Sequence, residues 1–268
     1  MIKVCVAGGT GWTGRAVASA VMDTADLELH SAVARSAAGS DLGHAWGRPD
    51  NGVPVFGTVA QALDGCDVLV DYTSYASIRE HTLAAIDRGV HVVVGSSGLS
   101  KADLAEIDSR AKDNGVGVFA AGNFSITATL MQLAALVVAP HLPSWEIIDY
   151  ASATKPDSPS GTSRELAESL AEVKRPYLDR PIAETGGLVE ARGASVAGTQ
   201  IHSVRLPGYE LATELVFGLP HERLIIRHES GHDATQFVDG TLLAVRKVVA
   251  AVGVVRSLAS LLLSDGHA

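Results

Sequence analysis

The sequence predicts an α/β protein: a Rossmann-type parallel-sheet domain plus a second α+β domain with a mixed sheet. Over residues 2–123, apolar strand-like runs alternate with amphipathic helical stretches, which is typical of a parallel sheet covered on both faces. Further along, strand-like runs follow one another with few helices between them, which indicates an antiparallel or mixed sheet. Glycine is abundant, with 27 residues against 10 prolines, as many tight strand-to-helix turns require.

The first domain takes its elements from hydrophobic periodicity and from helix end signals. Strands are expected at residues 2–7, 27–34, 68–73, 91–98 and 116–123. Helices are expected at residues 14–24, 77–89 and 100–115, with Gly89 closing the second and Ser100 at the N-cap position of the third. A longer helix over residues 125–142 should stop near Pro140 and Pro143.

The second domain and the chain end complete the organisation. Strands are expected at residues 146–152, 192–206, 212–218 and 223–230, with one helix at residues 163–175. The apolar stretch 237–263 is expected to be helical and to pack back on the first domain. We therefore expect a dinucleotide-binding domain from residues 1–124 together with 237–268, and a substrate-binding and oligomerisation domain from residues 125–236.

Composition and charge exclude several classes of protein. The net charge is −9 and no Lys/Arg-rich run exists, so nucleic acid is not an expected partner. No apolar stretch reaches the roughly 18 residues of a membrane helix, so we expect no membrane association and a cytoplasmic location. Cys5 and Cys66 lie in strand-like runs and are interpreted as buried apolar residues. No His/Asp/Glu spacing indicates a metal site.

A glycine-rich turn follows the first strand. Gly8, Gly11 and Gly14 give a GxxGxxG spacing, and Thr10, Trp12 and Thr13 stand between them at the start of a helix. Glycines permit the tight turn, the close approach of a pyrophosphate and close helix–strand packing, while the helix N-terminus supplies amides to the phosphates. In this strand–turn–helix context the motif predicts a dinucleotide site, although a purely structural turn is the alternative.

The end of the second strand bears on the choice of cofactor. An Asp or Glu about 20 residues past the glycines would hold the ribose 2′-hydroxyl of NAD, but Ala34, Arg35 and Ser36 stand there. Arg35 and Ser36 are suited to a 2′-phosphate, which favours NADPH and leaves NADH as a second possibility. A solvated surface arginine is the alternative interpretation of Arg35.

A second motif lies before the helix of the second domain. Ser160, Gly161 and Thr162 precede it, and Glu165 stands three residues after Thr162 in a capping-box pattern. The structural interpretation is a good helix start. The functional one is an anion cradle of hydroxyls and free amides that holds a carboxylate. Lys155 would add positive charge or donate a proton there.

Together these motifs resemble the dihydrodipicolinate reductase (4-hydroxy-tetrahydrodipicolinate reductase) family over nearly the full length. The segments that carry the resemblance are "VAGGTGWTGR", "VDYTSYASIREHTLAAIDRGVHVVVGSSGLS", "AAGNFSITATLMQL", "EIIDYASATKPDSPSGT", "IHSVRLPG", "FGLPHERLIIRHES" and "DGTLLAVRKV". The resemblance implies a homotetramer that transfers hydride from a nicotinamide to a small carboxylated imine. It implies Lys155 as the catalytic residue and a substrate carboxylate on Ser160, Gly161 and Thr162, with Ser152 nearby. It also implies cofactor contacts from Tyr72, Thr73, Gly95, Ser97, Ala121, Asn123 and Phe124.

The chain departs from the family pattern on the substrate side. The family has two adjacent histidines shortly before the lysine, the first assigned as acid/base, and Ala151 and Ser152 stand at those positions. A further polar or basic position is Thr154, and the segment 228–237 is one residue longer than usual and lacks an arginine. His202, His228 and His232 could face the cleft, although a histidine in such a position is more often a hydrogen-bonded structural or surface residue.

These departures leave several functions open. The main hypothesis is an NADPH-dependent reductase of a carboxylated imine or iminium, which need not be the lysine-pathway substrate. The alternatives are an authentic 4-hydroxy-tetrahydrodipicolinate reductase, a reductive-amination or amine dehydrogenase enzyme, and a non-catalytic NADPH- or metabolite-binding protein. The retained Lys155 and Ser160–Thr162 argue against the last, because a pure cofactor binder has no use for a substrate cradle.

Overall fold

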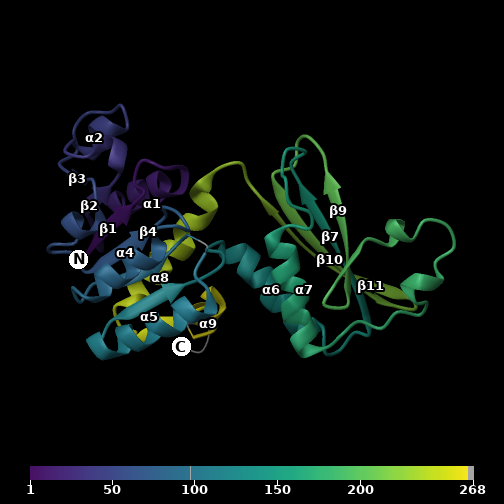
Figure 1. Cartoon of the computed structure of the whole chain (residues 1–268). Helices are drawn as coiled ribbons and strands as arrows, with labels where there is room; N and C mark the ends of the chain where they lie inside the picture. Colours follow the sequence, from purple (N-terminus) through teal and green to yellow (C-terminus); the bar gives the residue numbers. More distant parts are fainter. Residues whose placement is uncertain (97, 265–268) are drawn as a thin grey trace. The chain divides into compact units, whose positions relative to one another are not determined.

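The computed structural model describes residues 1–96 and 98–264 and divides the chain into two compact units (Figure 1). The first unit runs from Met1 to Ile126 and resumes at Asp233, and the second is Thr127–His232. Each unit has its own sheet and its own hydrophobic core. The predicted fold class, a Rossmann-type parallel sheet plus a second domain with a mixed sheet, is confirmed.

The sheet of the first unit has seven strands, all parallel, in the order β12-β6-β5-β4-β1-β2-β3. Its central strands are buried on both faces, because helices cover both sides of a parallel sheet. Their bounds are β1 Ile2–Ala7, β2 Leu27–Val33, β3 Val55–Phe56, β4 Val68–Asp71, β5 His91–Val94, β6 Gly117–Ala120 and β12 Gly253–Val255.

Helices cover the two faces of this sheet with separate apolar clusters. One cluster joins the sheet to α1 and α8 through Val17, Val21 and Val245, and the other joins it to α4 and α5 through Ile86 and Ile107. The helices are α1 Trp12–Met22, α2 Leu42–Ala45, α3 Val59–Ala62, α4 Ile78–Ile86, α5 Lys101–Asn114, α8 Val238–Val248 and α9 Leu258–Ser264, with 3₁₀ turns η1 Arg35–Ala37 and η4 Ala234–Phe237. No helix among the described residues is long and apolar enough to cross a membrane.

The end of the chain corrects one expectation. Residues 237–263 are not helical throughout, because α8 ends at Val248 and β12 (Gly253–Val255) follows. Gly253 has a φ of +84°, a left-handed conformation that does not continue a helix. Val254 and Val255 then pair in parallel with Val118 and Phe119 of β6, where β-branched side chains suit a strand.

The second unit is built on a five-stranded mixed sheet in the order β11-β10-β7-β9-β8. Only the β7–β9 pair is parallel. Its elements are β7 Ser144–Ala151, β8 Ala194–Val196, β9 Thr199–Arg205, β10 Leu211–Leu219, β11 Glu222–Ser230, α6 Ile126–Val138, α7 Gly161–Val173, η2 Ile182–Glu184 and η3 Val189–Arg192. Trp145, Ile147 and Phe217 form a core with Leu166 and Leu170 of α7.

The predicted strand over residues 192–206 is two strands rather than one. β8 and β9 form an antiparallel hairpin in which Val196 pairs with Thr199. Ala197 and Gly198, the two residues of the turn, have φ angles of 51° and 94°. Positive φ at both central residues matches the twist of a tight hairpin, and only Gly198 adopts it without strain.

Candidate active site

The glycine turn of the first unit is tightly packed against neighbouring backbone. Gly8 has a φ of +85°, and a Cβ there would lie 2.7 Å from the carbonyl oxygen of Tyr72. A Cβ at Gly14 would lie 2.1 Å from the carbonyl oxygen of Gly8, so α1 approaches the end of β1 more closely than any side chain allows. Gly11 is the N-cap of α1. This is the close helix–strand approach that a dinucleotide turn needs.

The first turn of α1 is suited to an anion. Trp12 and Thr13 begin the helix just after Thr10, and no acidic side chain lies in its first turn. The free amides and the helix dipole there favour negative charge. The Trp12 side chain is 62% exposed, with its ring edge-on to Phe237 at a centroid distance of 6.2 Å.

Trp46, a residue that the sequence analysis does not single out, supports this turn. The indole Nε1 of Trp46 donates to the carbonyl oxygen of Gly9 at 3.0 Å, and the Arg15 guanidinium lies 5.4 Å from the centre of the Trp46 ring. Trp46 is buried and follows the short helix α2. It escaped prediction because residues 42–62 carry no clear periodicity, and the contact joins residues 37 apart.

Arg35 and Ser36 open the 3₁₀ turn that follows β2. Both side chains are exposed. Because β1 and β2 are adjacent parallel strands, their carboxyl ends meet at one edge of the sheet, where a dinucleotide binds in this class of fold. The position of Arg35 and Ser36 is therefore consistent with the predicted contact to a 2′-phosphate.

The ends of β4 and β5 bring Tyr72, Thr73 and Gly95 together. A Cβ at Gly95 would lie 2.3 Å from the Tyr72 ring, so the glycine makes room for the tyrosine. The Tyr72 hydroxyl lies 2.7 Å from Oγ1 of Thr241, and burial raises the pKa of this phenol. The Tyr72 side chain is therefore neutral and held in place at the carboxyl-terminal edge of the sheet.

A buried carboxylate orients Thr73. Oδ1 of Asp71 accepts from the backbone amide of Thr73 at 2.8 Å and from its hydroxyl at 2.6 Å, and Oδ2 lies 2.7 Å from Nδ1 of His81. Asp71 is 0% exposed. We did not predict Asp71 or His81, although an acid ending an otherwise apolar strand is the signal that could have identified the first.

The residues after β6 divide into different roles. Phe124 is 2% exposed and packs edge-on against Tyr72 and Phe119, at centroid distances of 6.1 Å and 5.8 Å. Oδ1 of Asn123 accepts from the amide of Ser125 at 2.8 Å, and Ala121 is half-buried beside the cluster. Phe124 therefore supports the site from within the core. Ser97 lies outside the described residues.

The second motif forms a helix start, with one correction. Ser160 is the N-cap of α7, and its hydroxyl accepts from the amide of Ser163 at 3.3 Å. The capping box from Thr162 to Glu165 is therefore wrong, because the helix already begins at Gly161. Gly161 is exposed and a Cβ there would meet nothing within 4 Å. The amides of Gly161 and Thr162 thus belong to the free first turn of a 13-residue helix.

Lys155 lies in the turn that leads to this helix. Its amide donates to the carbonyl oxygen of Ser152 at 3.0 Å, and its Nζ lies 2.7 Å from Oδ1 of Asp157. The hydrogen bond from Lys155 lowers the pKa of Asp157. The hydroxyls of Ser152 and Thr154 lie 3.0 Å apart. The structure therefore gathers Ser152, Thr154 and Lys155 in one turn.

A buried polar network, which the sequence analysis also does not predict, holds this turn to the sheet. Oδ2 of Asp149 accepts from the amide of Ser160 at 2.9 Å and from Nη2 of Arg205 at 2.7 Å, and Oδ1 accepts from the Ser163 hydroxyl at 3.1 Å. The same Arg205 nitrogen donates to the carbonyl oxygen of Asp157 at 2.9 Å. Asp149 is 0% exposed. The network fixes both ends of the segment that carries Lys155.

The pKa of Asp149 follows from this environment. Burial alone would raise it, but the hydrogen bonds from Ser160 and the ion pair with Arg205 outweigh burial and lower the pKa. The carboxylate is therefore charged at neutral pH. Two residues along β7, Ala151 is also fully buried and points to the same face of the sheet as Asp149.

The three histidines singled out in the sequence as facing the cleft, His202, His228 and His232, have different surroundings. Nε2 of His228 lies 3.0 Å from the Thr127 hydroxyl, and burial lowers the pKa of this imidazole. Nδ1 of His232 lies 2.6 Å from Oε1 of Glu210. Nε2 of His202 lies 2.7 Å from Oε2 of Glu146. No group of three His, Cys, Asp or Glu residues within the described ranges is arranged to hold a metal ion.

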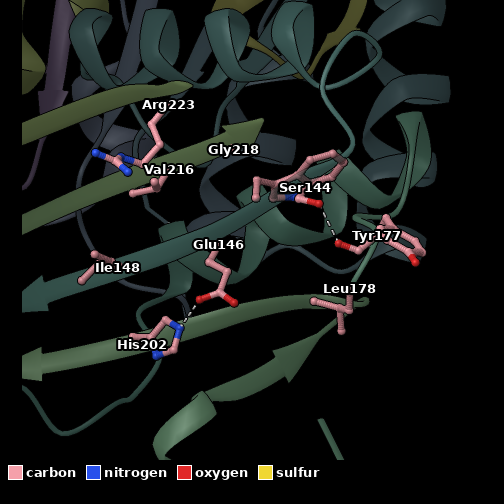
Figure 2. Close-up of a pocket in the computed structure, with 10 residues that line it drawn as sticks. Ser144, Glu146, Ile148, Tyr177, Leu178, His202, Val216, Gly218 and Arg223 are labelled. Atoms are coloured by element: carbon pink, nitrogen blue, oxygen red, sulfur yellow. Dashed lines mark hydrogen bonds and ion pairs between the residues drawn. The ribbon is translucent and has the colours of Figure 1, made fainter. Parts of the chain in front are cut away.

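A hollow of about 460 Å³ lies on the outer face of the second sheet (Figure 2). Figure 2 shows His202 of β9 pointing toward Glu146 of β7, and Tyr177 and Leu178 also line the hollow. Its β7 residues, Ser144 to Ile148, precede the Asp149 and Ala151 end of the strand. The hollow therefore does not contain Lys155 or the Ser160–Thr162 cradle.

Comparisons with known proteins agree over both units. Residues 2–124 match the family described as "Dihydrodipicolinate reductase, N-terminus", and residues 123–262 match "Dihydrodipicolinate reductase, C-terminus". The 4-hydroxy-tetrahydrodipicolinate reductase of Halalkalibacterium halodurans is 36% identical over 93% of this chain and 95% of its own length. That of Lactiplantibacillus plantarum is 36% identical over 92% and 95%.

Solved structures give the same result. Dipicolinate-bound dihydrodipicolinate reductase from Paenisporosarcina sp. TG-14 is 31% identical, with a TM-score of 0.87 over 97% of this chain and 99% of that one. An amine dehydrogenase from Mycobacterium smegmatis, 18% identical with a TM-score of 0.66 over 95% and 94%, shares the fold alone. The chain is an oxidoreductase that belongs to the dihydrodipicolinate reductase family.

Proposed function

We propose that this protein is the 4-hydroxy-tetrahydrodipicolinate reductase of lysine biosynthesis. The observation that carries the proposal is the presence, in one chain, of a dinucleotide turn and of a lysine-bearing anion cradle held by a buried network. Relatives that bear this name match the chain at 36% identity over 93% of its length. The lysine-pathway substrate therefore has better support than the redirected substrate that Ala151 and Ser152 suggest.

The residues of the first unit fit a nicotinamide dinucleotide. The backbone contacts at Gly8 and Gly14 leave no room for a Cβ, and the first turn of α1 carries no acid. We propose that this turn holds the pyrophosphate and that Arg35 and Ser36 hold the 2′-phosphate of NADPH. Tyr72, Thr73 and Gly95 would line the nicotinamide end. When bound, this group supplies hydride.

The residues of the second unit fit a small carboxylated substrate. The amides of Gly161 and Thr162 at the start of α7 are placed to bind one carboxylate, with the Thr162 hydroxyl beside them. Lys155 adds positive charge in the turn before them, although Asp157 shares that charge. Two anion-binding features within eight residues suit a dicarboxylate better than a neutral substrate.

We further propose that the protein is a homotetramer. On the outer face of the second sheet, Ile225 of the edge strand β11 is 54% exposed, and Val216 and Ile148 of the neighbouring strands lie on the same face, where they line the hollow of Figure 2. Exposed apolar residues grouped on a sheet face are typical of subunit interfaces. Light scattering coupled to gel filtration tests this, with a mass of four chains expected and a monomer mass as the contrary result.

The activity is tested by following the loss of NADPH absorbance with freshly generated 4-hydroxy-tetrahydrodipicolinate. A panel of cyclic imines with one carboxylate or none is assayed beside it. We expect rapid turnover of the dicarboxylate and slow turnover of the panel. Turnover of another imine alone would support a redirected enzyme marked by Ala151 and Ser152. Reductive amination and a non-catalytic role have no specific observation in their favour.

A further inference from the structure

His232 lies beside the turn that carries Lys155, although it is far from that turn in sequence. It is the last residue of the second unit, two residues after β11 ends at Ser230. Its Nδ1 lies 2.6 Å from Oε1 of Glu210, the residue just before β10. The side chain is 78% exposed, so it is accessible to a small molecule.

Two hydrogen bonds connect this pair to the Lys155 turn. The carbonyl oxygen of Glu210 accepts from the amide of Ser152 at 3.3 Å, and the carbonyl oxygen of Ser152 accepts from the amide of Lys155 at 3.0 Å. The strand register agrees, because Leu211 pairs with Ala151 on one side and with Ser230 on the other. The His232 imidazole therefore stands next to the end of β7, where Ala151 and Ser152 offer no acid.

Other groups near this turn are poorly suited to donate a proton at neutral pH. The Lys155 ammonium is engaged by the Asp157 carboxylate at 2.7 Å. The hydroxyls of Ser152 and Thr154 contact each other at 3.0 Å and are weak acids. Histidine is the side chain that most often serves as a general acid in enzymes.

The surroundings of the other two candidate histidines, His202 and His228, do not suit a general acid at this turn. His202 pairs with Glu146 on the outer face, in the hollow of Figure 2. His228 contacts the Thr127 hydroxyl, and burial lowers the pKa of its imidazole, which favours the neutral form. His232 alone among these three combines exposure, a carboxylate partner and a hydrogen-bonded connection to Ser152.

We propose that His232 is the general acid of the reductase and that Glu210 positions it. A carboxylate only accepts, so Nδ1 of His232 donates to Glu210 and Nε2 is the nitrogen that gains and loses a proton. Within the part of the chain that the structure describes, Nε2 has no hydrogen-bond partner. This orientation of an imidazole by a carboxylate is the same device that serves acid–base catalysis in other enzymes.

The step is a two-electron reduction of an imine or of a conjugated imine. When bound, the reduced nicotinamide would supply a hydride that forms a C–H bond at the electrophilic carbon, and the nicotinamide would be oxidised in the process. The electron pair of the C=N π bond moves to nitrogen, which takes the proton from Nε2 of His232. The imidazole, left neutral, regains a proton from water. This inference rests on the function proposed above, since it needs a carboxylated imine in the cradle of α7.

The test compares His232→Ala with His221→Ala, which removes an exposed histidine from the β10–β11 turn at the opposite end of the hairpin. We expect His232→Ala to lower kcat by about 10²-fold, the lower end of the range for a general acid. The His221→Ala enzyme should retain wild-type kcat. Added imidazole should restore much of the kcat of His232→Ala, because the missing side chain is exposed. A purely structural role would not respond to imidazole.

A binding measurement provides a readout that does not need turnover. Nuclear magnetic resonance of the histidine Cε1–H groups, assigned with the two variants, is followed while dipicolinate is added to the NADPH-loaded wild-type protein. We expect the His232 signal to shift and the His221 signal to stay. A dipicolinate-saturated protein with an unmoved His232 signal would overturn the inference.

Failure of the proposed function is seen separately, in the wild type. If the wild type does not reduce the dicarboxylate, the function proposed above fails, and the variants are compared on whichever cyclic imine of the panel it does reduce. The His232 inference is overturned if His232→Ala keeps wild-type kcat on that imine, if imidazole gives no rescue, or if the wild type reduces none of the imines.

Discussion

The two units of this molecule build their candidate binding surfaces in different ways. The first relies on close approach of the backbone at two glycines. A Cβ at Gly8 would lie 2.7 Å from the carbonyl oxygen of Tyr72, and a Cβ at Gly14 would lie 2.1 Å from the carbonyl oxygen of Gly8. The second relies on a buried charge, Asp149, which ties Ser160 and Arg205 to one strand. The surface of the first unit should therefore be sensitive to any added side-chain atom at these glycines. The surface of the second should instead be sensitive to the loss of a hydrogen-bond or ion-pair partner of Asp149. The following predictions test this contrast, from the largest effect to the smallest.

The largest effect should come from Gly14→Ala. Its Cβ would lie 2.1 Å from the Gly8 carbonyl oxygen, which is backbone and cannot move aside cheaply. We expect a cost of about 3 kcal/mol, seen as a cofactor dissociation constant raised by about a hundredfold. Calorimetric titration with NADPH measures it. The control is Gly186→Ala, where a Cβ meets nothing within 4 Å, and equal losses in both variants would refute the backbone account.

Asp149→Asn should affect the other unit. The neutral amide loses the ion pair with Arg205, and hydrogen bonds to charged groups contribute about 2 kcal/mol. We expect the free energy of unfolding to fall by about that amount and dipicolinate to bind more weakly, with NADPH affinity unchanged. Urea unfolding and the two titrations measure these quantities.

The matched control for Asp149→Asn is Glu146→Gln in the same strand. Glu146 pairs with Arg192 and His202 on the outer face, and its side chain is 34% exposed. Partly exposed pairs contribute at most about 1 kcal/mol. Loss of dipicolinate affinity in Glu146→Gln, or loss of NADPH affinity in Asp149→Asn, would mean that the two surfaces are not separable.

Arg35→Ala should separate the two nicotinamide cofactors. If Arg35 holds the 2′-phosphate, its loss removes a charge-assisted hydrogen bond and weakens NADPH binding by about tenfold, while NADH, which lacks that phosphate, is unaffected. The NADH titration is the internal control. Equal affinity of wild type and variant for NADPH would instead support the interpretation of Arg35 as a solvated surface residue.

Trp46→Phe should have the smallest effect. Phenylalanine keeps most of the buried ring but loses the hydrogen bond to the Gly9 carbonyl, a loss of about 1 kcal/mol. We expect a modest loss of NADPH affinity. Trp145→Phe in the second unit loses a similar bond, 3.1 Å to the Thr199 hydroxyl, and should lower stability without changing NADPH affinity. The reverse pattern would contradict the role given to Trp46.

How far the sequence predicts the molecule depends on how local each feature is. The glycine turn and the helix start at Ser160 are written in consecutive residues, and the structure forms both, although the cap is Ser160 rather than Thr162. The 192–206 hairpin and β12 differ from the prediction because the chain adopts positive φ at Ala197 and Gly198, and at Gly253, within stretches that the sequence pattern assigns to single elements. Turn chemistry at single glycines outweighed periodicity at both places.

The supporting residues were beyond prediction for a different reason. Asp149 and Arg205 lie 56 residues apart, and Tyr72 and Thr241 lie 169 apart. Each is an ordinary polar residue in its own segment, and only the pairing of β7 with β9, or the return of α8 to the first sheet, brings the partners together. Sequence patterns report local preference, whereas these bonds are set by topology.

The most direct test of the central claim is growth of a bacterium that lacks its own 4-hydroxy-tetrahydrodipicolinate reductase. Expression of this protein should restore growth without added lysine or its precursors, and the Lys155→Ala variant, made to the same level, should not. Growth with the wild type and none with the variant is the predicted result. Absence of growth although soluble wild-type protein accumulates would contradict the proposed function.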